Sequence, residues 1–130
     1  MIKKIFMACL FMAFFCSLSH ARNWDRLIKA IIKVETNGNT KAKNGKCVGV
    51  IQITPLMVKQ CNIIQKEKHF SLNDRYSKKY SIEIFKIIQE HYNPKGNIEK
   101  AIRIWNGGPN YSAKSTNRYY RRVMKEYNKI

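Results

Sequence analysis

Turns rich in Asn and Gly interrupt this sequence, and the segments between them carry apolar residues at helical spacing. The turns lie at residues 36–39, 93–96 and 106–109. Each turn follows a segment in which apolar side chains return every three or four residues, the period of one face of an α-helix. Patterns typical of strands are scarce. The sequence therefore predicts a mainly helical domain whose helices end at turns, where functional residues are often placed.

We expect helices at residues 24–35, 55–61, 78–92, 98–105 and 116–127. Thr54 before Pro55 is a good start signal, since Thr caps a helix and Pro is tolerated at its first position. Ser77 is the expected cap of the third helix. Gly96 or Asn97 is expected to begin the fourth, and Ser115 or Thr116 to cap the last. The expected core faces are Trp24, Leu27, Ile28 and Ile31; Leu56, Met57 and Val58; Ile82, Phe85, Ile88 and Tyr92; Ile98, Ala101, Ile102 and Trp105; and Tyr119, Tyr120, Val123 and Tyr127.

The remaining segments have weaker signals. Residues 43–45 read as a turn, and residues 47–53 as a short strand or a buried loop. Residues 65–75 are polar and irregular. We expect no regular element in this last segment.

Glu35 continues the apolar face of the first predicted helix. Burial disfavours a charged carboxylate, so the pKa of Glu35 should rise toward the range in which it can donate a proton near neutral pH. Asn37 and Gly38 suit a left-handed C-cap, which would place Glu35 at a helix end beside a cleft. The alternative is a partly exposed Glu at a frayed terminus. We interpret Glu35 as a candidate general acid.

The first 21 residues have the layout of a secretory signal. Lys3 and Lys4 precede an apolar run at residues 5–18, and Ala21 closes a cleavage site of small residues. The run is short for a membrane span. We therefore expect a signal peptide at residues 1–21, export to the periplasm or the medium, and one domain at residues 22–130.

The chain is strongly basic, with 25 Lys and Arg against 8 Asp and Glu and a formal net charge of +17. Such a charge attracts polyanions. Because the chain reads as exported and lacks a nucleic-acid-binding motif, we expect anionic envelope polymers or membrane surfaces as partners, and no specific nucleic acid. The basic residues are dispersed, which argues against a membrane-active amphipathic helix.

Two cysteines, Cys47 and Cys61, lie outside the predicted signal peptide. In an oxidising compartment they could pair, closing a loop of about 15 residues worth roughly 3 kcal/mol. Two buried thiols are the alternative, because the sequence does not show whether the two residues approach. His69 and His91 lack a third ligand at a recognisable spacing, so we predict no metal site and no cofactor.

Four separated motifs follow one another along the chain. They are Glu35-Thr36 with Asn39, Ala42, Asn44 and Gly45; Gly49-Val50-Ile51-Gln52 with Thr54-Pro55; Ala101 through Trp105-Asn106-Gly107-Gly108; and Ser115-Thr116 with Tyr119, Tyr120 and Val123. In this order they resemble the Glu-Ser, Gly-Leu-Met-Gln, Ala-Tyr-Asn-Ala-Gly and Glu-Thr-x-x-Tyr-Val blocks of the lytic transglycosylase family, specifically its small single-domain secreted members. The chain departs from these blocks with Thr36 for Ser, Val50-Ile51 for Leu-Met, Trp105 for Tyr, Ser115 for Glu and Tyr120 for Val.

The resemblance implies a single compact lysozyme-like helical domain of the goose type, with a substrate cleft and peptidoglycan glycan strands as substrate. It implies cleavage of the β-1,4 bond between N-acetylmuramic acid and N-acetylglucosamine. Glu35 would act as acid and then as base, leaving 1,6-anhydromuramyl ends. Thr36, Gln52, Asn106 and Tyr119 would bind substrate. Glu67 and Asp74 are candidate second acids, which we interpret as solvated loop residues.

Three alternatives stay open. A muramidase would use the same fold and acid with water in place of the muramyl C6 hydroxyl. A non-catalytic wall-binding module would keep the fold alone, and a cationic membrane-active protein would depend on charge alone. We expect a monomer. An envelope-spanning secretion or conjugation apparatus is a further candidate partner.

Overall fold

Helices make up most of residues 24–130, which is the part of the chain described by the computed structural model. The predicted signal peptide lies outside this part. The mainly helical class is confirmed, and no helix within residues 24–130 has the length and apolar character needed to cross a bilayer. The elements are an N-terminal helix over residues 24–35, β1 (Lys43–Asn44), β2 (Cys47–Val48), α2 (Pro55–Ile64), the 3-10 helix η1 (Leu72–Tyr76), α3 (Lys78–Tyr92), α4 (Ile98–Gly107) and α5 (Ala113–Tyr127).

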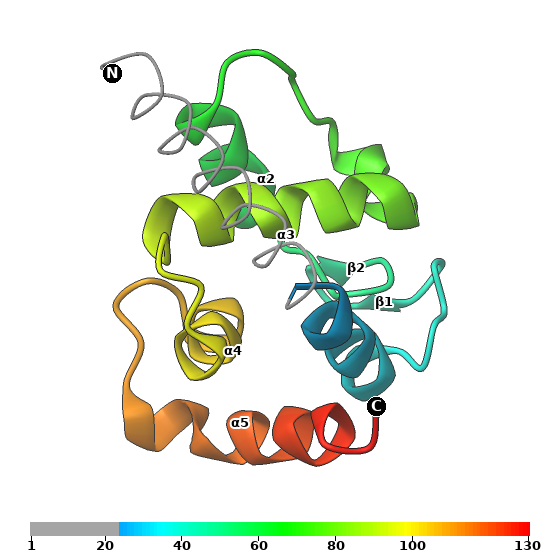
Figure 1. Cartoon of the computed structure of the whole chain (residues 1–130). Helices are drawn as coiled ribbons and strands as arrows, with labels where there is room; N and C mark the ends of the chain where they lie inside the picture. The colour runs from blue at the N-terminus through cyan, green and yellow to red at the C-terminus, as the bar shows by residue number, and fades with distance from the viewer. Residues whose placement is uncertain (1–23) are drawn as a thin grey trace, which may run out of the picture.

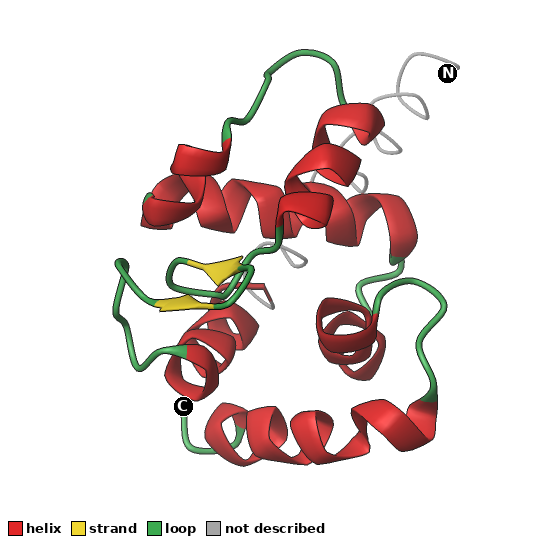
Figure 2. Cartoon of the chain, turned by 180° about the vertical axis from the view of Figure 1, so that it is seen from behind, coloured by secondary structure: helices red, strands yellow, loops and turns green. Residues whose placement is uncertain are grey.

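The N-terminal helix and α4 lie on opposite sides of the space between α3 and α5 (Figure 1). The antiparallel hairpin of β1 and β2 sits between the N-terminal helix and α3, as the view from behind also shows (Figure 2). At the centre, the Phe85 ring of α3 lies 5.7 Å from that of Trp24 and 5.0 Å from that of Trp105, between centroids. Aromatic contacts therefore join three helices at one point of the core.

The predicted core faces are largely confirmed. In the N-terminal helix, Trp24, Leu27, Ile28 and Ile31 are all buried. The other predicted core residues that are buried are Val58, Phe85, Ile88, Ala101, Ile102, Trp105, Tyr119 and Val123. The remaining ones, apart from Leu56, are partly buried against this core; they are Met57, Ile82, Tyr92, Ile98, Tyr120 and Tyr127.

Leu56 is the exception, because 64 % of its surface is exposed. The buried residues of α2 are Val58 and Cys61, and Leu56 projects from the opposite side of this helix. Two further predictions are wrong. Lys43 and Asn44 form a strand, and residues 72–75 of the segment predicted to be irregular belong to η1.

The helix starts at Thr54, Ser77 and Asn97 are confirmed. Each side-chain oxygen accepts a hydrogen bond from the backbone N–H three residues later, at 3.2, 3.2 and 2.9 Å. The cap of α5 is Ser112, whose hydroxyl accepts from the N–H of Ser115 at 3.3 Å. The sequence prediction was wrong here because the first turn of α5 adds no large apolar residue to the helical pattern, only Ala113.

Arg75 ties η1 to the hairpin from inside the protein. Its buried guanidinium donates to the carbonyls of Lys46 and Ile53 at 3.0 and 3.1 Å. The backbone carbonyl of Arg75 lies against Gly49, where a Cβ atom would be only 1.8 Å from it. Gly49 also has a φ of +87°, which side-chain-bearing residues rarely adopt. Only glycine fits between the hairpin and η1.

We predict that Gly49→Ala lowers the free energy of unfolding by about 3 kcal/mol or more, since it adds backbone strain and a collision with a main-chain atom. Gly38→Ala is the matched control. Gly38 has a φ of +94° but open space around the position of its Cβ, so it should lose only about 1 kcal/mol. Urea denaturation of both variants measures this. Equal losses would show that the contact with Arg75 is unimportant.

Candidate active site

Glu35 is the last residue of the N-terminal helix and is half-buried. The helix ends here because Asn37 and Gly38 turn left-handed, with φ values of 53° and 94°. The N–H groups of Thr36 and Asn37 both bond to the carbonyl of Ile32, at 3.0 and 2.9 Å. The predicted C-cap is therefore confirmed, and Glu35 stands at a helix end with its carboxyl partly withdrawn from water.

The surroundings of Glu35 favour its protonated form. Burial raises the pKa of the carboxyl above its usual value, and this is the largest effect. The Tyr119 hydroxyl and the positive charge of Arg122 act in the opposite direction and lower the pKa. Because burial dominates, Glu35 keeps its proton to a higher pH than an exposed Glu would. These are the properties of a general acid.

Tyr119 brings a buried hydroxyl to this carboxyl from α5. The hydroxyl is near enough to lower the pKa of Glu35, yet no group within residues 24–130 gives it a hydrogen bond of normal length and angle. Burial and the neighbouring Glu35 raise the pKa of Tyr119 well above its usual value, so it remains a neutral phenol. A buried donor without a partner is costly, and such groups are common where a ligand completes the bond.

Side chains from three of the motifs meet at the turn formed by residues 49–52. The Thr36 hydroxyl donates to the carbonyl of Val50 at 2.7 Å. The indole N–H of Trp105 donates to the carbonyl of Ile51 at 3.1 Å, inside the core. The Gln52 amide donates to the carbonyl of Gly49 at 2.9 Å. These bonds fix the 49–52 turn against the end of the helix that carries Glu35.

Two of the predicted substrate-binding residues therefore already have partners in the protein. The Thr36 hydroxyl is used by the 49–52 turn, and the Gln52 amide nitrogen also lies 3.4 Å from the carbonyl of Ala42. Gln52 has a φ of 58°, a strained value for a residue other than glycine, which costs roughly 1–3 kcal/mol and is typical of functional sites. Its side-chain oxygen is the group left to accept a bond from a ligand.

Asn106 lies in the last turn of α4, where it is exposed. The two glycines after it have structural roles. A Cβ on Gly107 would lie 2.7 Å from the Thr116 side chain, so α5 packs closely only against glycine there. Gly108 ends α4 with a φ of 82°. The structure thus leaves Asn106 as the exposed polar residue of this motif.

The other candidate residues lie apart from this arrangement. Cys47 and Cys61 are free cysteines in the structure; Cys47 is half-buried, and burial raises the pKa of Cys61 to about 11. The Asp74 carboxylate accepts a bond from the backbone N–H of Ser71 at 2.8 Å and so caps η1. Glu67 is exposed in the loop before η1.

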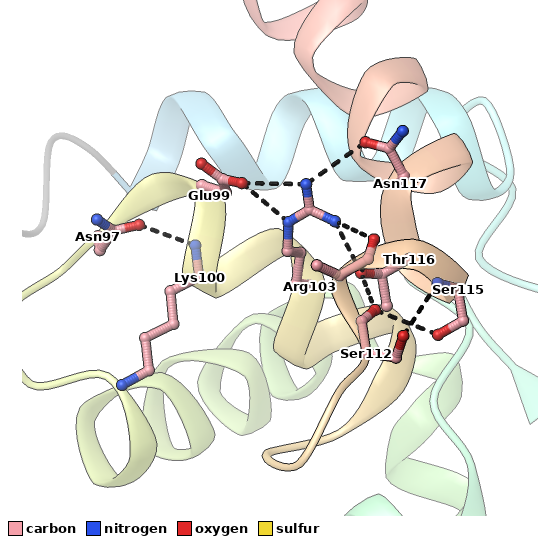
Figure 3. Close-up of polar contacts among 9 residues, drawn as sticks. Asn97, Glu99, Lys100, Arg103, Ser112, Ser115, Thr116 and Asn117 are labelled. Carbon is pink, nitrogen blue, oxygen red and sulfur yellow. Dashed lines mark hydrogen bonds and ion pairs between the residues drawn. The ribbon is translucent and has the colours of Figure 1, made fainter.

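Arg103 is a residue whose importance the sequence did not reveal (Figure 3). It is buried, and it donates to the carbonyl of Ala113 at 2.8 Å and to the Thr116 hydroxyl at 2.9 Å. Glu99, one turn earlier on α4, pairs with the guanidinium at 3.0 Å. Arg103 thereby fixes the start of α5, the helix that carries Tyr119. In the sequence it lies off the predicted apolar face of α4, so helical spacing gives no sign that it is buried.

The structure also explains the departure at Ser115. This residue is the third of α5, and its hydroxyl donates to the carbonyl of the cap residue Ser112 at 3.2 Å. A Glu in this position commonly reaches back to the N–H of the cap residue and completes a capping box. The change from Glu to Ser therefore affects a helix end.

Two hollows lie away from Glu35. One, of about 540 Å³, opens between the start of α4 and Tyr111. The other, of about 390 Å³, lies between α2 and the loop that leads to η1. Glu35 lines neither of them.

The family model described as "Transglycosylase SLT domain" matches residues 12–128. No curated protein and no solved structure matches the chain.

We predict that Glu35→Gln makes the protein more stable at pH 7, by about 0.5–2 kcal/mol, the usual gain from relaxing a functional site. The folded state holds the Glu35 proton more tightly than the unfolded state, so stability is lost as pH rises through the raised pKa. The gain should shrink near pH 4, where both states are protonated. Thermal unfolding at both pH values measures it. Glu67→Gln, at an exposed loop position, is the control, and a less stable Glu35→Gln at pH 7 would contradict this account.

Proposed function

The chain belongs to the transglycosylase SLT domain family, and from this membership we propose that it is a peptidoglycan lytic transglycosylase with Glu35 as its single acid and base. The observation that carries the proposal is the half-buried Glu35 carboxyl, whose pKa is raised by burial, beside the unpartnered hydroxyl of Tyr119. An acid at neutral pH and a hydrogen-bond donor next to it are what cleavage of a glycosidic bond requires.

In the first step, protonated Glu35 gives its proton to the oxygen that links N-acetylmuramic acid to the next sugar. The bond from that oxygen to the anomeric carbon breaks, and positive charge develops on the muramyl ring. In the second step, the Glu35 carboxylate takes the proton of the muramyl C6 hydroxyl while that oxygen bonds to the anomeric carbon. Glu35 ends protonated, the product carries a 1,6-anhydro ring, and no water is consumed.

The two steps make opposite demands on Glu35. Burial supports the first step, because it raises the pKa and so favours the protonated carboxyl. The Tyr119 hydroxyl and the charge of Arg122 support the second, because both favour the carboxylate once the proton has left. Tyr119 reaches this role by turning its unused O–H toward the carboxylate or toward the sugar.

A hydrolytic scheme needs a second carboxyl group about 5–9 Å from the first. Asp74 is engaged in capping η1, and Glu67 is exposed on a loop. Neither arrangement supports a role beside Glu35, so we favour the C6 hydroxyl over water as the nucleophile. This choice separates the proposal from a muramidase on the same fold.

We assign the remaining motif residues as follows. Gln52 presents its side-chain oxygen and Asn106 its exposed amide to hydroxyl or N-acetyl groups of the glycan. Thr36 positions Glu35 through its bond to Val50. Peptidoglycan lies outside the cytoplasm, and we propose that residues 1–21 direct export there. We still predict that the protein acts as a monomer. Its service to an envelope-spanning secretion or conjugation apparatus is likewise a prediction.

Digestion of purified peptidoglycan tests the reaction and the acid together. Wild type should release anhydromuramyl fragments, identified by mass spectrometry, and Glu35→Gln should release them about 10²–10⁴-fold more slowly. Glu67→Gln, the same change at an exposed position, should match wild type. Muramyl reducing ends without anhydro products would identify a muramidase. Binding of all three proteins to the wall without any cleavage would identify a non-catalytic module.

The pH dependence tests the role of Tyr119. Activity should fall as pH rises through the raised pKa of Glu35, because the acid must start protonated. Tyr119→Phe removes a group that lowers this pKa, so the alkaline limb of the variant's pH–activity profile should move to higher pH. Its rate should fall about ten- to hundredfold, as expected for losing a hydrogen bond to a charged group. Tyr120→Phe is the control, since Tyr120 packs on Arg103. A limb that moves to lower pH would contradict the assignment.

A further inference from the structure

Arg122 is an exposed arginine of α5 that takes part in none of the salt bridges or side-chain hydrogen bonds found among residues 24–130. The buried or half-buried arginines differ in this respect. Arg26 bonds the carbonyl of Tyr127, Arg75 clamps the hairpin, and Arg103 fixes the start of α5. The positive charge of Arg122 thus has no partner in the described part of the protein.

The packing of α5 places Arg122 near Glu35. At one end of the helix pair, the Arg26 guanidinium donates to the carbonyl of Tyr127 at 2.9 Å and lies 4.0 Å from its ring centroid. At the other end, the Tyr119 hydroxyl faces Glu35. Arg26 and Glu35 lie near the two ends of the N-terminal helix, and both contacts are made by residues from the middle and the end of α5, so this part of α5 packs against the N-terminal helix.

Arg122 follows Tyr119 by three residues and so lies one turn further along α5, on a neighbouring part of its surface. Its charge lowers the pKa of both Glu35 and Tyr119, which agrees with this position. A free guanidinium therefore stands at the edge of the site, outside the buried contact of Tyr119 with Glu35.

The substrate of the proposed reaction carries carboxylates close to the bond that breaks. Each muramyl residue has a lactyl group, whose carboxyl is either free or joined by an amide to a peptide, and the peptide has carboxylates of its own. A guanidinium binds a carboxylate through two parallel N–H groups, which gives orientation as well as attraction. Neutral glycan hydroxyls would gain much less from such a partner.

We propose that Arg122 forms a carboxylate subsite beside Glu35, which holds either the free muramyl lactyl group or a carboxylate of the attached peptide. This inference rests on the proposed function. Such a subsite orients the muramyl residue over Glu35 and makes the enzyme prefer charged strands over neutralised ones.

The test uses four preparations of the same glycan strands. One keeps its peptides, and one has lost them to an amidase, which leaves free lactyl carboxylates. The other two are these strands after carbodiimide coupling to ammonia, which converts carboxylates to amides. The KM for release of anhydromuramyl ends is measured at constant ionic strength for wild type, Arg122→Gln and Arg121→Gln. Arg121 is the matched control, because it is an exposed arginine at the next position of the same helix.

For wild type we expect amidation to raise KM about five- to tenfold, the range of one charge-assisted pair at an accessible site. Arg122→Gln should lose this difference, and Arg121→Gln should keep it. If Arg122→Gln loses the KM difference only on peptide-free strands, the lactyl carboxylate is the ligand. If the variant loses this difference only on peptide-bearing strands, a peptide carboxylate is the ligand.

Two results would overturn the subsite while leaving the proposed function intact. One is a wild type that cuts charged and amidated strands with the same KM. The other is Arg122→Gln with the discrimination of wild type on both kinds of strand. A wild type that forms no anhydromuramyl ends from any strand would overturn the proposed function, and this subsite with it.

Discussion

The geometry of this domain depends on hydrogen bonds that side chains make to the backbone of the 49–52 turn. Thr36 comes from the end of the N-terminal helix and Trp105 from α4, and each donates to a different carbonyl of the turn. On its other side, the turn lies against Arg75, with only glycine tolerated at the contact. These bonds are buried or partly buried, where losing one partner leaves an unsatisfied group at a cost of about 1–3 kcal/mol. The end of the helix that carries Glu35 is held in place from the turn.

This rigidity allows a carboxyl to remain in an unfavourable environment. Glu35 loses hydration, and its pKa rises for that reason, so the folded state is less stable at neutral pH than it would be with a neutral side chain there. Tyr119 adds a second cost, a buried hydroxyl without a partner. Both costs are local, and both are what the proposed function expects of a site whose ligand brings a proton acceptor and hydroxyl groups. A domain selected for stability alone would have neither feature.

The sequence predicted features that depend on neighbours in the chain. The core face of the N-terminal helix, the caps at Thr54, Ser77 and Asn97, and the left-handed turn after Glu35 all follow from local spacing and residue type. The bonds that Arg75 and Arg103 donate to the carbonyls of Ile53 and Ala113 could not be predicted, because these backbone groups lie 22 and 10 residues away in the chain. The same holds for Thr36 and Gln52: their motif indicated contact with a ligand, but only the fold shows that they also bind the 49–52 turn.

The two sides of the site are built by different means. The 49–52 turn has little freedom to vary, since its carbonyls are bound by side chains from separate helices and its glycine contacts η1. The α5 side is fixed at its ends, by Arg103 near its start and by Arg26 at Tyr127, while the middle turns expose side chains such as Arg122 beside Glu35. Substitutions at these exposed positions change the charge near Glu35 without disturbing the backbone that holds it. If the proposed function holds, differences in substrate preference are most easily accommodated on α5, whereas the proposed reaction depends on the turn and on the helix end that carries Glu35.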